Sequence, residues 1–252
     1  MRKTILTILA CVAAMLCQAQ ENPAYRIFTS DGEKTDYGTM LKALSKADVI
    51  FIGETHNCPI SHWIEYEVIS DMARKHPRGL VIGAEMLESD NQLLVDEYVS
   101  GVISSDRFES EAKLWDNHYT DYAPLLYLAR DKGFRFIATN VPRRYASFVK
   151  DNGLDALSGL SDAAKALMAP LPVAYDESTA ENEMFSFMNM MGGHGQQNHY
   201  AEAQALKDAP SSPLTARPLS RLQRRPAKSS PWRSTTSPAV WVPPWPRYMM
   251  LS

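Results

Sequence analysis

The chain has 252 residues, of which 45% are hydrophobic, so it has room for one domain of ordinary size with a buried core. Its formal net charge is −3, but nine basic residues lie at the two ends, two in the first three residues and seven after Ala209. Subtracting these nine charges from −3 leaves −12 for residues 20–209. So acidic a body argues against nucleic-acid binding.

Residues 1–19 have the pattern of an export signal. Arg2 and Lys3 form a short basic region, residues 4–16 are apolar, and residues 17–19 offer a small-residue cleavage site. The apolar stretch is too short to span a bilayer as a helix, so we expect a cleaved signal peptide rather than a membrane anchor. The alternative is a buried N-terminal helix. The protein is therefore predicted to be exported to the periplasm or the cell envelope.

Three cysteines bear on this prediction. A lipid anchor on Cys11 or Cys17 would hold the protein at a membrane, although the large Leu16 directly before Cys17 fits a lipoprotein signal poorly. After cleavage only Cys58 remains, so the mature chain cannot form an intramolecular disulfide.

After a lead-in at residues 20–46, residues 47–141 alternate short apolar runs with longer amphipathic ones. The strand-like runs are residues 48–53, 79–84 and 134–138, and the helical runs are residues 60–75, 92–99 and 122–132. Gly133 is expected to end the last helix. Such alternation, with nearly continuous apolar strands, predicts an α/β fold in which a mostly parallel sheet is flanked by helices.

Residues 142–209 show helical patterns and no convincing strand. Helices are expected at residues 156–168, 180–191 and 196–207, which would form a smaller helical subdomain against the sheet.

Polar residues are expected at the carboxyl end of each predicted strand. Glu54 and His56 follow the first strand, Glu85 the second, and Thr139 and Asn140 the third. Ligands and catalytic groups gather at this edge of open parallel sheets, so a shared site is predicted there.

Glu54, His56, His62 and Glu85 would suit a divalent metal, because zinc and its neighbours take imidazole and carboxylate ligands. Glu54 and His56 alternate along an extended segment, so both can point to one side. Their spacing is not diagnostic, and a hydrogen-bonded polar cluster that orders the loop is the alternative.

A series of short motifs between Asp48 and Asp208 is more specific than any one of them. In order, they are Phe51-Ile-Gly-Glu-Thr-His56, His62, Gly83-Ala-Glu-Met86, Gln92 with Asp96-Glu97-Tyr98 and Gly101, Trp115 with Tyr122 and Pro124-Leu125-Leu126, Asn140-Val-Pro-Arg143, and Tyr200 with Ala203-Gln204 and Lys207-Asp208. This series resembles the ChaN family of haem-binding lipoproteins, in the Tiki haem-uptake superfamily.

The resemblance implies a haem- or iron-binding protein of the cell envelope, involved in haem or iron uptake. We expect haem to be held in the helical subdomain or between the two copies of a homodimer. The superfamily also includes metal-dependent peptidases and esterase-like enzymes. A divalent-metal-dependent hydrolase is therefore the alternative function, and whether the chain is an enzyme stays open.

Haem needs an apolar slot and an axial ligand, which is often histidine or tyrosinate. The candidates for contact with haem are Tyr66, Met188, His194, His199 and Tyr200. The methionine-rich run around Met188 lines such a slot or simply packs a core. Asn140 and Arg143 are supporting candidates, Arg143 as a partner for a propionate. The isolated His76 and His118 are expected at the surface or in loops.

Residues 210–252 have a different composition, with nine prolines, eight serines, seven basic residues and no glycine or acidic residue. We expect a disordered tail that forms no strand. The resemblance implies a further strand ending in a Gly-x-x-His motif, but no histidine follows His199. The tail is therefore interpreted as a segment read in the wrong frame, which would leave an inner strand edge open. A natural basic tail is the alternative.

Overall fold

The computed structural model describes residues 23–77, 79–173, 175 and 199–209, and the backbone of residues 232–233, 240–241 and 248–251. The predicted signal at residues 1–19 lies outside the described residues, as does the predicted helix at 180–191 with Met188, and so does His194. In the part of the chain that the structure describes, no helix is long and apolar enough to cross a membrane.

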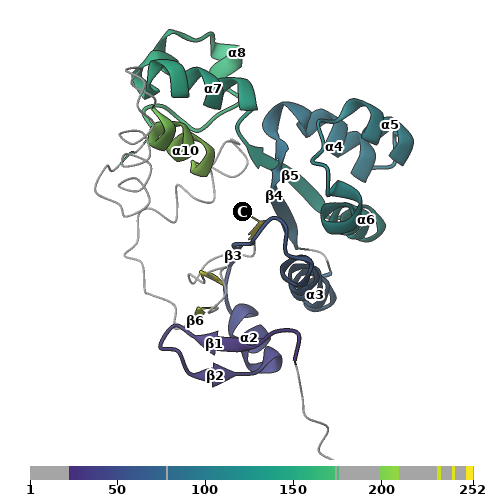
Figure 1. The fold of residues 1–252 in the computed structure, drawn as a ribbon. Coiled ribbons are helices and arrows are strands. Elements are labelled where there is room, and N and C mark those ends of the chain that lie inside the picture. The colour runs from purple at the N-terminus through teal and green to yellow at the C-terminus, as the bar shows by residue number, and fades with distance from the viewer. Residues whose placement is uncertain are drawn as a thin grey trace, which may run out of the picture.

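A five-stranded sheet forms the centre of the molecule (Figure 1). Its strands are β3 (Val49–Ile52), β4 (Val81–Glu88), β5 (Arg135–Asn140), β7 (Val240–Trp241) and β8 (Tyr248–Leu251), in the spatial order β5-β4-β8-β3-β7. All neighbouring pairs are parallel except β3 with the edge strand β7. The predicted α/β class with a mostly parallel sheet is confirmed.

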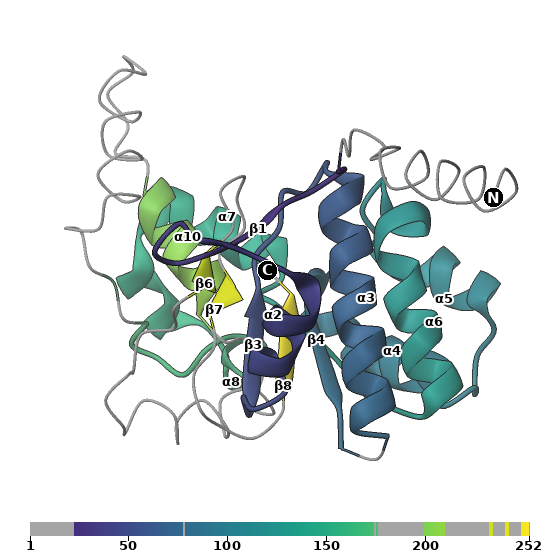
Figure 2. The ribbon, with the colours of Figure 1, turned by 90° about the horizontal axis from the view of Figure 1, so that it is seen from below.

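Helices flank this sheet. They are α3 (Pro59–Lys75), α4 (Gln92–Val99), α5 (Ser105–Glu111), α6 (Ala123–Lys132), α7 (Arg143–Asn152), α8 (Asp162–Lys165) and α10 (Tyr200–Asp208). Figures 1 and 2 show α3, α4, α5 and α6 on one side of β4, with α7, α8 and α10 on the opposite side. Helix α6 ends as expected, because Gly133 adopts a left-handed conformation with φ of 69°.

Buried apolar side chains form two clusters. The larger cluster joins the sheet to α3, α4 and α6, with Ile69, Ile82 and Leu125 almost fully buried. The smaller cluster includes Val149 of α7 and Leu206 of α10. The chain beyond β5 therefore packs around a core of its own.

The predicted helix at residues 156–168 is wrong as a continuous element. The segment forms a 3₁₀ helix, η3 (Leu154–Gly159), and then the short helix α8. Leu160 between them is extended, with ψ of 158°, and the Ser161 side chain accepts a hydrogen bond from the backbone N–H of Ala164. A capping serine inside the apolar pattern thus starts a new helix.

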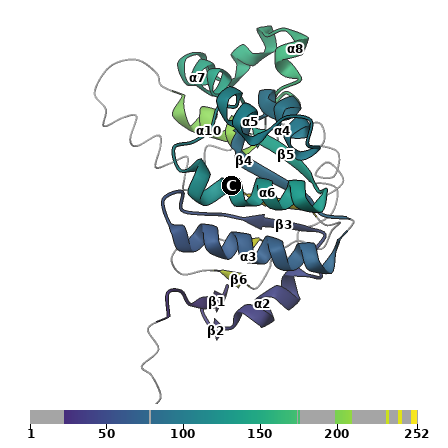
Figure 3. The same cartoon turned by 90° about the vertical axis from the view of Figure 1, so that its right-hand side faces the viewer.

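The lead-in folds into elements that the sequence pattern did not predict. Strands β1 (Ile27–Thr29) and β2 (Lys34–Thr35) form an antiparallel sheet with β6 (Trp232–Arg233), and Figure 3 shows this small sheet beside α2 (Tyr37–Leu44). The Asp36 side chain caps α2 by accepting from the backbone N–H of Thr39.

The expectation that the tail forms no strand is wrong for its described residues. Strand β8 lies between β3 and β4, with Tyr248 aligned to both Val49 and Val81, so the inner strand edges are paired. Prolines weigh on the average composition of the tail, but the segment Tyr248–Leu251 contains none and can supply every backbone donor that a central strand needs. The prediction of disorder otherwise falls on residues outside those described.

Candidate functional site

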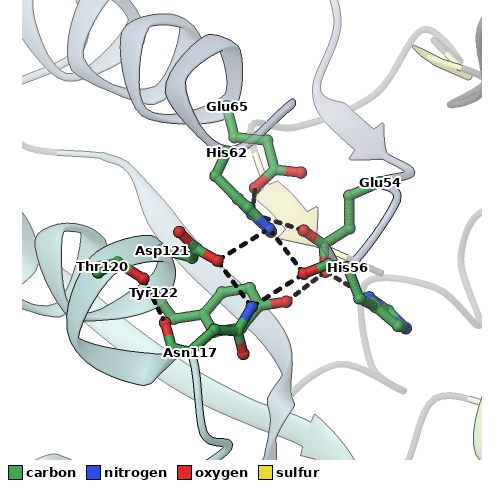
Figure 4. Close-up of polar contacts among 8 residues, drawn as sticks. All are labelled: Glu54, His56, His62, Glu65, Asn117, Thr120, Asp121 and Tyr122. Atoms are coloured by element: carbon green, nitrogen blue, oxygen red, sulfur yellow. Dashed lines mark hydrogen bonds and ion pairs between the residues drawn. The ribbon is translucent and has the colours of Figure 1, made fainter. Parts of the chain in front are cut away.

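Three neighbouring elements build a polar cluster at the carboxyl end of β3 (Figure 4). The loop after β3 carries Glu54 and His56, and the first turns of α3 carry His62 and Glu65. The third element is a single turn of π-helix, η2 (His118–Tyr122), directly before α6. Turns of this kind are frequent at functional sites.

Glu54 is the centre of the cluster. Its side chain is fully buried, and its Oε1 lies 2.8 Å from the Tyr122 hydroxyl, which donates to it, and 2.6 Å from Nδ1 of His56. Its Oε2 lies 2.7 Å from Nδ1 of His62. Burial raises the pKa of Glu54, but the bonds from His62, His56 and Tyr122 outweigh it and leave the pKa below its ordinary value. The structure therefore holds Glu54 as a carboxylate.

His62 is buried between carboxylates. Its Nδ1 faces Oε2 of Glu54 and, at 3.4 Å, Oε2 of Glu65. Its Nε2 lies 3.1 Å from the backbone oxygen of His56 and 3.5 Å from Oδ2 of Asp121. Burial alone would lower the pKa of His62, but these partners raise it to about 10. The raised pKa favours the imidazolium form of His62, which is paired with the carboxylates of Glu54 and Glu65 at Nδ1 and hydrogen-bonds the backbone oxygen of His56 at Nε2.

Glu65 faces His62 from the next turn of α3 and is only 1% exposed. Burial raises the pKa of Glu65 to about 7, against the opposing effect of His62. Neither carboxylate oxygen of Glu65 has a hydrogen-bond partner among the described residues. Ligand atoms of Glu54, His62 and Glu65 lie within 4.8 Å of one another, an arrangement that could hold a metal ion.

His56 is the half-exposed member of the cluster, with 48% of its side chain accessible. Its ring meets the Trp115 ring edge to face, with 4.9 Å between centroids. Its backbone oxygen accepts a 2.9 Å hydrogen bond from Nδ2 of Asn117. The loop is therefore held at the backbone oxygen and at Nδ1 of His56, while almost half of the side-chain surface stays accessible.

Comparison with known proteins now identifies the fold and the family. The model of the haem-binding uptake family of the Tiki superfamily, ChaN, matches residues 40–210. The chain belongs to the ChaN family. The match ends at residue 210, where the segment rich in proline and serine begins.

A solved structure described as cofacial haem binding to ChaN of Campylobacter jejuni has the same fold. It aligns with a TM-score of 0.57 at 16% identity, covering 92% of this chain and 81% of that chain. Among curated proteins, the chloroplastic Protein RETICULATA-RELATED 5 of Arabidopsis thaliana is 24% identical over 133 residues, which are 50% of this chain. The match spans 18% of the plant protein's length.

Two of the four predicted metal ligands, Glu54 and His62, lie in the group that could hold a metal ion, whereas His56 and Glu85 lie outside it. Glu85 does not stand at a strand end, because β4 continues to Glu88. Burial, together with Asp208, raises the pKa of Glu85, while His56 opposes this rise. Glu85 is thus within electrostatic reach of His56 but outside the group of ligand atoms. Glu65 stands in that group instead, and its spacing of three residues after His62 on a helix was the signal that could have found it.

The remaining predicted ligands lie elsewhere in this ChaN-family chain. Tyr66 packs against the larger apolar cluster, and His199 and Tyr200 begin α10. Asn140 ends β5 with its buried side-chain oxygen unbonded among the described residues, and Arg143 is exposed at the start of α7. None of these five forms a hydrogen bond with Glu54 or His62 within the described ranges, and their role as ligands stays a prediction.

Besides Glu65, two members of the cluster were not predicted from the sequence. Asp121 and Tyr122 lie more than fifty residues after His62 and reach it only through the packing of η2 against α3. Tyr122 was part of the motif series, but nothing in the sequence predicted its hydrogen bond to Glu54.

Proposed function

We propose that this chain binds haem and takes part in haem or iron uptake at the cell envelope. Membership of a family described as haem-binding uptake proteins is the observation that carries this proposal. The structural relative from Campylobacter jejuni, described as binding haem cofacially, supports it.

The donor groups that the described residues expose fit haem. Haem iron takes histidine or tyrosinate as an axial ligand, and haem supplies a redox-active iron when bound. The imidazoles of His56 and His199 are partly accessible, and Tyr200 is 44% exposed. Trp115 adds an aromatic surface beside His56. The exposed guanidinium of Arg143 suits a propionate.

Titration of haemin into the purified chain tests the proposal. We expect a Soret band that shifts and saturates at micromolar haemin, and the absence of any spectral change would contradict it. Tyr119→Ala removes an exposed aromatic ring that is not among the candidate ligands. It is the matched control for nonspecific adsorption of haemin to apolar surface, and it should leave the titration unchanged.

The envelope role needs a separate test. Residues 1–19 support export, and a lipid on Cys11 or Cys17 would anchor the protein. Fractionation of expressing cells, with mass spectrometry of the mature N-terminus, is expected to place a processed chain in the periplasm or the membrane fraction. An unprocessed chain in the cytoplasm would contradict this. Sedimentation with and without haem tests the proposed homodimer.

A divalent-metal-dependent hydrolase is the second candidate, favoured by the grouping of Glu54, His62 and Glu65. A metal held by these residues would activate water for hydrolysis. Metal analysis is expected to find zinc, manganese or cobalt in proportion to protein, and to lose it in His62→Ala. No bound metal and no hydrolysis on peptide and ester panels would remove this candidate.

A further inference from the structure

The described part of the helical subdomain, residues 141–173 and 199–208, packs mainly on itself. Val149 of α7, Leu157 of η3 and Leu206 of α10 are fully buried in the smaller apolar cluster, which shares no residue with the larger one. Among the described elements, α7, η3 and α10 contact one another closely but make few contacts with the elements of residues 23–140, the sheet body. A unit that shares so little apolar interface with its neighbour is expected to move relative to it.

A two-residue connection joins this unit to the sheet body. β5 ends at Asn140 and α7 begins at Arg143, and Figure 1 shows α7, α8 and α10 beyond that end of β5. Val141 belongs to the smaller cluster and therefore moves with the subdomain. The bend is thus expected between Asn140 and Val141, because hinges absorb motion at the ends of elements.

An ion pair spans the junction at its surface. Nη1 of Arg144 on α7 lies 2.5 Å from Oδ2 of Asp90, which stands in the 3₁₀ turn η1 (Ser89–Asn91) after β4. In the same turn, the Ser89 hydroxyl donates a 2.6 Å hydrogen bond to the backbone oxygen of Leu167. The Arg144 side chain is 47% exposed, so its ion pair is weak enough to break and re-form.

Breaking this pair leaves neither charge uncompensated. Arg144 can turn to water, and Nζ of Lys113 in the sheet body already lies 3.5 Å from Oδ2 of Asp90. Three buried polar atoms of the sheet body, Oδ1 of Asp90, Nδ2 of Asn91 and Oδ1 of Asn140, have no hydrogen-bond partner among the described residues. Such groups are costly while buried, and opening the junction exposes them to solvent. The closed position is therefore expected to be only slightly favoured.

We propose that the helical subdomain turns as one body about the connection between Asn140 and Val141, and that the Arg144–Asp90 ion pair is the latch that holds it against the sheet body.

The motion controls access to the candidate site, a step that rests on the proposed haem-binding function. His56 lies in the sheet body, whereas His199 and Tyr200 lie in the subdomain at the start of α10. Asp208, at the other end of α10, is close enough to Glu85 on β4 to raise its pKa, so α10 approaches the carboxyl edge of the sheet. Haem bound between the two parts enters and leaves when the latch is open.

Distances between two spin labels test the hinge without haem. Lys132→Cys on α6 and Ser147→Cys on α7 place one label on each part at exposed positions, in a chain whose native cysteines are replaced by serine. This labelled parent is expected to show one dominant distance and a minor second one. Arg144→Ala should raise the minor population about two- to fivefold, the range that a partly exposed ion pair supports. A single distance in both proteins would overturn the hinge, and an unchanged minor population would overturn the latch.

Further variants separate a latch from a general structural role. Arg144→Lys keeps the charge and should keep the dominant distance. Asp90→Asn removes the charge on the other side, and the double variant with Arg144→Ala should open no further, because both changes remove one interaction. Arg143→Ala, at an exposed neighbouring position with no ion pair among the described residues, is the matched control. Additive effects in the double variant, or an equal effect of Arg143→Ala, would overturn the latch.

Haem exchange distinguishes this inference from the proposed function. Transfer of haem from the loaded chain to excess apomyoglobin should be about two- to fivefold faster in Arg144→Ala than in the wild type. If the wild type binds no haem, the proposed function fails, while the spin-label distances still decide the hinge. Equal transfer rates, despite a changed distance distribution, would overturn the control of access and leave the hinge standing.

Discussion

Two histidines of this molecule are almost equally buried, but the pKa of one is raised and the pKa of the other is lowered. His62 is 4% exposed and His118 is 3% exposed. His62 lies among the carboxylates of Glu54, Glu65 and Asp121, and its pKa rises to about 10. His118 lies against the rings of neighbouring residues, and burial lowers its pKa to about 4. The neighbours of a buried imidazole, rather than its burial, decide whether it is charged.

The difference in pKa separates His62, which belongs to the polar cluster, from His118, which packs among aromatic rings. His62 lies between the carboxylates of Glu54 and Glu65, whereas the His118 ring lies beside the rings of Phe108 and Tyr119. The expectation that His118 lies at the surface or in a loop was wrong as to its exposure. It sits in η2, the same turn that brings Asp121 and Tyr122 to His62.

The largest expected effect is that of His62→Ala. The change leaves Glu54 and Glu65 buried without the charge that compensates them, so the free energy of unfolding should fall by about 3–5 kcal/mol. Urea unfolding at pH 7 measures it. Arg143→Ala, an exposed helix position, is the control and should stay within about 0.5 kcal/mol. A loss below about 1 kcal/mol for His62→Ala would show that the buried charges are not coupled as described.

The second effect concerns acid stability and His118. Its folded pKa of about 4 lies below the unfolded value of about 6.5, so the unfolded chain binds the extra proton first. The stability that neutral His118 contributes is therefore complete above about pH 6.5 and is lost as the pH falls toward 4. His118→Phe should remove about 2 kcal/mol of this pH dependence. Unfolding curves at pH 7, 5.5 and 4.5 measure it, and identical slopes in both proteins would contradict the assignment.

The smallest effect is expected for the partly exposed pair His199–Glu202. Glu202→Gln keeps an acceptor for the backbone N–H of Leu154 but removes the charge beside His199. The free energy of unfolding should fall by about 1 kcal/mol or less, because exposed ion pairs contribute little. Thermal unfolding of Glu202→Gln and of His62→Ala, each against the wild type, measures the two losses of stability. A loss as large as that of the buried site would remove the distinction between the two pairs.

Much of this arrangement could be predicted from local patterns. The apolar patterns predicted β3, β4, β5, α3, α4 and α6, but not α5 or η2. Glu54, His56 and His62 do meet at the end of β3. Glu85 was misplaced because the apolar run of β4 extends past it. Tyr122 and Asp121 reach the cluster by tertiary packing, which no local spacing encodes.

The tail shows that average composition is also a poor guide to local structure. Averaged over residues 210–252, proline and serine argued against any strand, yet β8 completes the central sheet. Whether this segment is read in the family's frame stays a prediction. Resequencing of the gene across codons 205–252 tests it, and an uninterrupted frame with a soluble, cooperatively folding product would refute the frame interpretation.

The most direct test of the central claim is haem retained by the purified chain after equilibrium dialysis against haemin. Wild-type protein is expected to retain haem in proportion to its concentration, with the alkaline pyridine spectrum of protohaem. Wild-type protein that emerges from dialysis without haem would contradict the account.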